Sequence, residues 1–220
     1  MLAAGAAGMV FGGRIQSTIS SALAPLTQRD PTGLTSLLPT GGQFRYYSVT
    51  GGQPHRTEAD YRLTVGGLVK RSTTYTLRDL RALPQVQLTR DFQCVTGWRV
   101  EDVPWSGVPL STVLDAAGVR PTASALRLTS FDGTYTESLT LDQARRPDVI
   151  IALQMYGKPV TRAHGGPVRL YVAPMYGYKS LKWLGGIEVV DRVVPGYWEE
   201  LGYDVDAWIG RSNGRDDEPV

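Results

Sequence analysis

The chain has 220 residues, of which 42% are hydrophobic and 20% charged, a composition typical of one soluble globular domain with a short appendage. Lysine and arginine total 23 against 21 aspartates and glutamates, so the net charge is +2 and no basic stripe indicates a nucleic-acid partner. With 25 glycines and 14 prolines, many turns and short strands are expected rather than long helices.

The chain opens with a small, apolar run from Leu2 to Phe11, which is too short to span a bilayer. This run is similar to the apolar core of an export signal, although no basic segment precedes it. We therefore expect residues 1–43 to be a signal or anchor remnant with an arm. The protein is then expected to be exported, and a longer N-terminus is one way to anchor it in a membrane. A disordered or interfacial arm is the alternative.

Alternating hydrophobic residues predict strands, and capping residues predict short helices between them. Thr76, followed three residues later by Asp79, predicts the start of a helix that Pro84 stops, and Thr140 predicts another through residue 144. A third helix is expected over 110–117, closed by Gly118. The expected strands are 61–69, 86–92, 125–130, 134–139, 149–155, 168–173 and 187–190, with a hairpin turn at Asp132-Gly133 and another turn over 104–109.

Many short strands and few short helices indicate an α+β domain dominated by mixed sheet. We place this domain at residues 44–203. Residues 204–220 are polar, and we expect them to form a tail that frays.

Cys94 is the only cysteine, so it cannot form an internal disulfide. It is a buried apolar residue, a catalytic thiol, or a ligand to a soft metal. A predicted strand runs directly into it and Gly97 follows, which suits a thiol that points into the floor of a pocket. These surroundings favour the third alternative, in which Cys94 is a ligand to a soft metal.

Two loops carry further candidates. His164 and Arg169 flank a glycine turn, and the segment 177–183 carries Lys179, Ser180 and Lys182, which suit an anion site. Solvated lysines on a turn are the alternative. A zinc site is not indicated, because no histidine has a standard ligand spacing from the cysteine. A hydrolase with a cysteine nucleophile and His164 as base remains open.

Several motifs in the same order resemble the sulfite oxidase superfamily of molybdopterin enzymes, over residues 44–200. Any one of them is weak, whereas the ordered series is specific. The motifs are 61–69, Cys94-Val95-Thr96-Gly97-Trp98, 105–110, 132–139, Tyr156-Gly157-Lys158-Pro159, 164–170 and 176–184.

The resemblance implies a sulfite-oxidase-type molybdopterin-binding fold, with a barrel-like core of mixed sheet and short helices. Cys94 resembles the thiolate that binds molybdenum beside the pterin, which is chemically sensible for a soft ligand. Tyr135 resembles a tyrosine near the metal centre, and Arg99 resembles an anion-binding arginine. The implied cofactor-binding residues are Arg45, Tyr46, Cys94, Asp132, His164, Arg169, Ser180, Leu181 and Lys182.

Departures from the sulfite oxidases bear on the substrate. Trp98 stands where those enzymes have an asparagine, and Arg99 alone remains of an arginine pair. Their immunoglobulin-like and haem domains are expected to be absent. The pattern is more similar to exported bacterial relatives, among them the catalytic subunit of the periplasmic protein-methionine-sulfoxide reductase, which partners with a membrane haem protein.

We therefore expect a monomeric molybdenum-dependent oxidoreductase that transfers an oxygen atom. Its expected substrate is a small or protein-bound sulfoxide or related S- or N-oxide, and its electron partner is a membrane haem or quinone-linked protein. Sulfite oxidation by the same centre, the cysteine hydrolase, and a non-catalytic binding domain stay open as alternatives.

Overall fold

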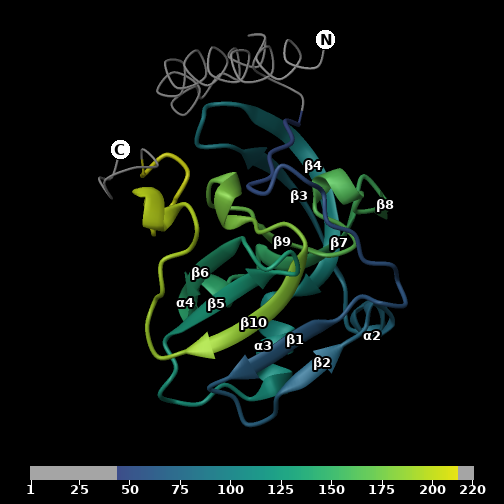
Figure 1. Cartoon of the computed structure of the whole chain (residues 1–220), viewed down its shortest axis with the longest axis vertical. Helices are drawn as coiled ribbons and strands as arrows, with labels where there is room; N and C mark the ends of the chain where they lie inside the picture. Colours follow the sequence, from purple (N-terminus) through teal and green to yellow (C-terminus); the bar gives the residue numbers. More distant parts are fainter. Residues whose placement is uncertain (1–43, 213–220) are drawn as a thin grey trace, which may run out of the picture.

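A computed structural model describes residues 44–212 of the chain. Two β-sheets form most of it, with short helices at their margins (Figure 1). The first sheet has the order β2 (Thr73–Tyr75), β1 (Leu63–Gly67), β10 (Leu184–Val190), β5 (Ala125–Ser130) and β6 (Thr136–Thr140). The second has the order β3 (Val86–Gln93), β4 (Arg99–Pro109), β7 (Val149–Met155) and β8 (Lys158–Pro159), and β9 (Arg169–Val172) also pairs with β7.

The first sheet is mixed, because β1 runs parallel to β10 while its other pairs are antiparallel. The pairs of the second sheet are antiparallel throughout. This combination of mixed sheet with few short helices confirms the predicted α+β class. The helical segments are α2 (Leu77–Ala82), α3 (Leu110–Ala117), α4 (Leu141–Ala144), η2 (Arg162–His164), η3 (Gly177–Lys179) and η4 (Glu199–Leu201).

The predicted helix caps are confirmed. Thr76 and Asp79 form a reciprocal capping box at the start of α2, with the Thr76 Oγ1 atom 3.1 Å from the Asp79 nitrogen. Thr140 and Gln143 form a second box at α4. Gly118 ends α3 in the left-handed region at φ 69°, where a residue without a side chain is favoured.

The predicted turn at 104–109 is wrong, because these residues belong to the long strand β4. Pro104 pairs with Thr89 of β3, and Pro109 pairs with Ile150 of β7. The β4–β7 register shifts between Ser106 and Gly107, and a second irregularity lies earlier, at Asp102, whose φ of 49° accompanies a shift of the β3–β4 register. Pairing on both sides therefore overrides the local turn signal of the prolines.

A separate aromatic cluster lies at the second sheet, away from the main aliphatic core. The rings of Trp105 and Tyr171 stack with centroids 4.4 Å apart, and Phe92 stacks on Trp98 at 5.7 Å. Phe92, Trp105 and Tyr171 belong to β3, β4 and β9, so these buried rings pack the three strands together. The loops that follow β3 and β9 begin beside this cluster.

Both ends of the described chain pack against these loops. In Figure 1 the segment 44–60 descends along one side of the molecule and the segment 191–212 rises along the other. The Tyr176 hydroxyl donates to the Ser212 carbonyl at 2.9 Å, and Ala207 is fully buried. The expectation of a fraying tail is therefore wrong for residues 204–212, and residues 213–220 lie outside the described part.

The predicted signal or anchor remnant at residues 1–43 also lies outside the described residues. Between residues 44 and 212, the structure contains no helix with the length and apolarity that a bilayer crossing requires.

Candidate active site

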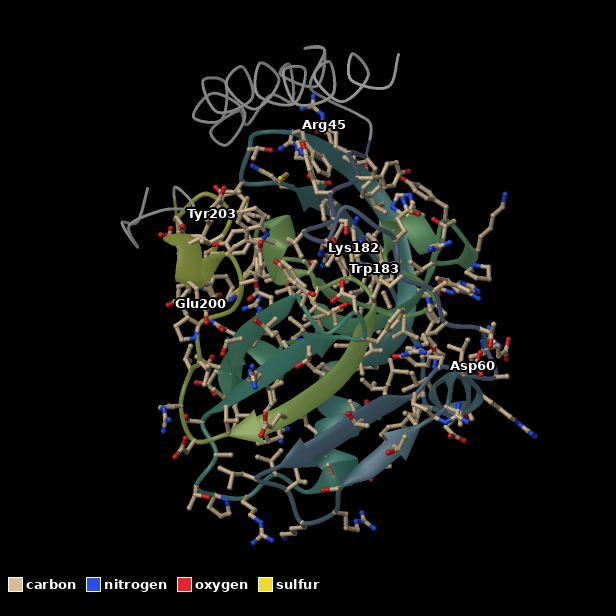
Figure 2. All side chains as sticks on the ribbon, viewed as in Figure 1. Arg45, Asp60, Lys182, Trp183, Glu200 and Tyr203 are labelled. Atoms are coloured by element: carbon tan, nitrogen blue, oxygen red, sulfur yellow. The ribbon has the colours of Figure 1, made fainter. Side chains whose placement is uncertain are left out.

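A cavity of about 450 Å³ opens where the loops after β3, β9 and η2 meet the two terminal segments. This volume lies within the range of pockets that hold small molecules or cofactors. Figure 2 shows Lys182 and Trp183 near the centre of the molecule, with Arg45 above them and Tyr203 to one side. All the predicted site residues except Arg99 and Leu181 line the cavity.

Cys94 lies directly after β3, at the floor of the cavity. Its amide donates to the Trp98 carbonyl at 2.9 Å, and Gly97 closes the turn with φ 96°. The Thr96 hydroxyl donates to the thiol sulfur at 3.2 Å. Burial raises the pKa of Cys94, while the Thr96 hydrogen bond and Arg45 act in the opposite direction. The sulfur is therefore a thiol in this environment and must lose a proton to bind a metal.

His164 is held by aromatic side chains of the N-terminal segment. The Tyr46 hydroxyl lies 3.0 Å from His164 Nε2, and the Phe44 ring packs edge-on at 4.7 Å. Burial, Arg169 and Lys182 lower the pKa of His164 to about 4, so the ring is neutral at physiological pH. It can then donate or accept one hydrogen bond.

No hydrogen bond joins the side chains of Cys94 and His164 within residues 44–212. A cysteine hydrolase needs its base within hydrogen-bond reach of the thiol, so this geometry does not favour that alternative.

Gly165 allows the His164 loop to lie against Lys182. Its φ is 99°, and a Cβ atom at this position would lie 2.7 Å from the Lys182 Cβ atom. Any side chain would therefore separate the two loops that bring His164 and Lys182 to the cavity.

Arg169 is a buried cation without a carboxylate partner in the described chain. Its guanidinium donates to the carbonyls of His164 at 2.8 Å and Ser180 at 2.7 Å, and it lies 5.3 Å from the Phe92 ring centre. Burial lowers the pKa of Arg169 to about 10, so it remains charged at neutral pH. A buried charge held only by carbonyls and rings suits an anionic ligand.

Lys182 is a second such cation. Its ammonium donates to the carbonyls of Tyr47 at 3.1 Å and Ala163 at 3.0 Å. Burial and the neighbouring Arg169 lower the pKa of Lys182 to about 7. An anion placed beside this ammonium would favour its charged form.

Asp132 presents an acceptor to the cavity. Its Oδ1 atom accepts from the amides of Thr134 and Tyr135, at 2.8 and 3.2 Å. Its Oδ2 atom is buried and has no hydrogen-bond partner in the described part of the chain, as is also true of Trp98 Nε1. Both residues line the cavity, so a ligand with N–H donors and acceptors would satisfy them.

Two predicted residues and one expected role do not fit this arrangement. Arg99 does not line the cavity and forms ion pairs with Glu101 at 2.6 Å and Asp91 at 3.8 Å. Leu181 is fully buried in the main core, with its carbonyl bound to a β9 amide. Lys179, expected beside Lys182 at the anion site, instead lies buried between two carboxylates.

The sequence reasoning missed an aromatic wall that the C-terminal segment adds to the cavity. Tyr197, Trp198 and Tyr203 line it, and the Tyr197 ring lies 5.8 Å from the Tyr135 ring. The clustering of three aromatic residues after the last strand was the available signal. It was weak, because only the fold brings this segment to the cavity.

Comparison with known proteins identifies the class. Residues 50–198 match the family described as the oxidoreductase molybdopterin binding domain. The chain therefore belongs to this family and is a molybdenum-dependent oxidoreductase whose cofactor is a molybdopterin.

The chain is 32% identical over 202 residues to the uncharacterized oxidoreductase YuiH of Bacillus subtilis strain 168, covering 91% of this chain and 96% of YuiH. It is 36% identical over 155 residues to YedZ1 of Azospira oryzae, a putative protein-methionine-sulfoxide reductase subunit, covering 70% of this chain and 57% of that one. The crystal structure of the sulfane dehydrogenase SoxCD from Paracoccus pantotrophus aligns with a TM-score of 0.61 at 26% identity, over 66% of this chain and 41% of that one.

The residues of the cavity fit this cofactor. Molybdopterin carries a phosphate and a pterin ring with several N–H donors and acceptors. Arg169 and Lys182 are cations without carboxylate partners in the described chain, and Asp132 offers a buried acceptor that lacks a donor. Cys94 supplies one soft ligand, while residues 44–212 hold no cluster of three histidine, cysteine or acidic residues for a metal. The protein thus offers one thiolate and an anion site, as a metal carried by a sulfur-containing cofactor requires.

Proposed function

We propose that the cavity binds molybdopterin, with Cys94 as the protein ligand to molybdenum, and that the loaded protein reduces a sulfoxide or related S- or N-oxide. The observation that carries the proposal is the single thiol in a cavity that is also lined by aromatic rings and by Arg169 and Lys182, two cations without a carboxylate partner in the described chain. When bound, the cofactor supplies oxygen-atom transfer. The protein supplies binding, orientation and exclusion of water.

Each cavity residue has a proposed part. Arg169 and Lys182 hold the phosphate, and Ser180 positions Arg169 through its carbonyl. Asp132 accepts a hydrogen bond from the pterin. Neutral His164 and its partner Tyr46 cover the pterin. Arg45 and Tyr135 line the cavity, and Arg45 acts electrostatically on Cys94, so we assign Arg45 the role first expected of Arg99.

The walls favour a neutral substrate over sulfite. Sulfite is a dianion, and removing it from water requires several converging positive groups. Arg99 is turned to acidic neighbours, and Arg169 and Lys182 are assigned to the phosphate, so Arg45 is the one cation left for a substrate among the described residues of the cavity. Trp98, Trp198 and Tyr203 present rings to the cavity. A sulfoxide has one acceptor oxygen and an apolar body, which suits such walls.

The first prediction tests metal and substrate together. Protein made in a host with the cofactor pathway should contain about one molybdenum per chain, since the cavity offers one thiolate ligand. With reduced viologen it should reduce sulfoxides, and with ferricyanide it should oxidise sulfite poorly. Elemental analysis and both steady-state assays measure this. Protein lacking molybdenum, or a kcat/KM for sulfite above that for every sulfoxide, would overturn the proposal.

The second prediction concerns retention of the cofactor. Lys182→Ala removes a charge-assisted contact to the phosphate, which costs about 1.5–3 kcal/mol, or roughly tenfold to a hundredfold in affinity. Because the pKa of Lys182 is about 7 without an anion beside it, binding of the phosphate takes up a proton above that pH. Affinity should therefore fall as pH rises from 7. Arg169→Ala should also lose cofactor, with added instability from two carbonyls left without a donor.

Pterin and molybdenum contents after gel filtration at several pH values measure this retention. Arg192→Ala is the matched control, because Arg192 is exposed and pairs with its neighbour Asp191. Full cofactor occupancy in Lys182→Ala with lost activity would move this residue from binding to chemistry.

We further propose an exported, monomeric catalytic subunit that receives electrons from a membrane haem or quinone-linked protein. The support is the likeness to the sulfoxide reductase subunit over 70% of this chain. Because the chain spans 57% of that relative, its assembly need not be the same. Cell fractionation tests the location, and a purely cytoplasmic pool would contradict export. Sedimentation of the purified protein tests the oligomeric state.

A further inference from the structure

A fully buried charge cluster lies beside the cavity, between three elements. Lys179 of η3 places its ammonium 2.7 Å from Glu137 Oε2 of β6 and pairs also with Glu199 of η4. All three side chains have 0% exposure. The second oxygen of Glu199 accepts from the Gly196 amide at 2.6 Å, and Glu137 Oε2 also accepts from the Ser138 amide at 3.1 Å.

The charges of this cluster do not balance when both carboxylates are ionised. Two negative groups then face one positive group, and an uncompensated buried charge is costly. One extra proton makes the cluster neutral. Lys179 and Glu199 are the charged groups that face Glu137, and the Tyr135 hydroxyl is its neutral polar neighbour.

The ionisation of Glu137 agrees with this balance. Burial, opposed by Lys179 and reinforced by Glu199, raises the pKa of Glu137 to about 8. The pKa of Lys179 is raised too, since both carboxylates outweigh its burial. At neutral pH the extra proton is therefore on a carboxyl group and the lysine is charged.

Tyr135 connects the cluster with the cavity. Its side chain lines the cavity, and its hydroxyl oxygen lies 3.4 Å from Glu137 Oε1. The same hydroxyl donates to the Tyr178 carbonyl at 2.7 Å, which fixes the ring. Burial first, and then the two acidic neighbours, raise the pKa of Tyr135 well above its ordinary value, so the phenol stays neutral. A neutral hydroxyl can accept one proton while it releases another.

We infer that Glu137, Lys179 and Glu199 form a one-proton store, which supplies the cavity through the Tyr135 hydroxyl. The inference rests on the proposed function, since reducing a sulfoxide to a sulfide and water consumes two electrons and two protons. A reduced viologen or haem donor supplies the electrons. The Glu137 O–H bond breaks and its proton passes to the Tyr135 oxygen, while the Tyr135 proton leaves its hydrogen bond to the Tyr178 carbonyl and passes to the oxygen leaving as water. The second proton, and the one that reloads Glu137, come from solvent.

Glu137→Gln tests the store without leaving an unbalanced charge. Glutamine has nearly the shape of a protonated glutamate, and Lys179 keeps Glu199 as its partner. Tyr135→Phe removes only the connecting hydroxyl. Asp148→Asn is the matched control, because Asp148 is 18% exposed, forms an ion pair with Arg146, and does not line the cavity.

The store itself is measured without turnover. Infrared spectra of the loaded protein, titrated in heavy and light water, should show one protonated carboxyl band that disappears near pH 8. The band should be missing in Glu137→Gln and present in Tyr135→Phe and Asp148→Asn. Its absence from the unaltered protein, or its persistence in Glu137→Gln, would overturn the inference.

Delivery is measured by the pH profile of kcat for a small sulfoxide with reduced viologen. The unaltered protein should slow above pH 8, whereas Glu137→Gln and Tyr135→Phe should be at least about tenfold slower at pH 7, with no such inflection. Asp148→Asn should follow the unaltered protein. An unchanged profile in Glu137→Gln would refute delivery. If the unaltered protein shows the carboxyl band but reduces no sulfoxide, the proposed function is refuted, whereas the one-proton store is not.

Discussion

Cys94→Ser should abolish turnover while the protein stays folded. Serine is close to cysteine in size, and the Thr96 hydroxyl that now donates to sulfur can donate to oxygen. The turn is held by backbone hydrogen bonds, including the one from the Cys94 amide to the Trp98 carbonyl, which the substitution does not touch. A hydroxyl is, however, a harder ligand than a thiolate and is not deprotonated at neutral pH.

The expected loss is at least about a thousandfold in kcat, as for removal of a group essential to the reacting centre. Steady-state sulfoxide reduction measures it, and circular dichroism with pterin analysis checks fold and cofactor content. Thr96→Val is the informative companion, because it keeps the thiol and removes its hydrogen bond. A serine variant with near-full activity would show that Cys94 is only a buried residue.

Local signals allowed the helices to be predicted, and long-range pairing explains where the prediction was wrong. The capping box at Thr76 and the left-handed Gly118 involve residues within one helical turn, so the sequence contains the whole interaction. The same local reasoning predicts a turn between Pro104 and Pro109. They lie in a strand because β3 and β7 pair with β4 on its two sides, and no local pattern records those partners.

The same contrast holds for the site. Cys94, His164 and Arg169 were predictable because family motifs carry them in order. The aromatic wall from Tyr197 to Tyr203 was missed, because it follows the last strand and reaches the cavity only through the fold. The two lysines of one loop could not be told apart in sequence, since their partners come from elements distant in the chain.

Lys179→Met should destabilise the protein strongly, and Lys182→Met should not. Removing Lys179 leaves Glu137 and Glu199 buried without a cation, and breaking a buried pair in this way costs about 3–5 kcal/mol. Lys182 faces the cavity, and its charged form is already disfavoured there, since its pKa is lowered to about 7. Its loss should therefore not lower the unfolding free energy of the cofactor-free protein by more than about 1 kcal/mol.

The pH dependence gives this contrast a second test. In Lys179→Met the carboxyl group of Glu137 loses the cation that opposes its burial, so its folded pKa is raised further above the unfolded value. Stability is then greatest at low pH and falls as pH rises through the folded pKa of Glu137. Urea unfolding of Lys179→Met should show a larger deficit at pH 8 than at pH 5. Lys182→Met should show no deficit at either pH, because it removes a group whose lowered folded-state pKa already costs stability at both pH values. Equal stability losses for the two variants at both pH values would mean that Lys179 does not neutralise the buried carboxylates.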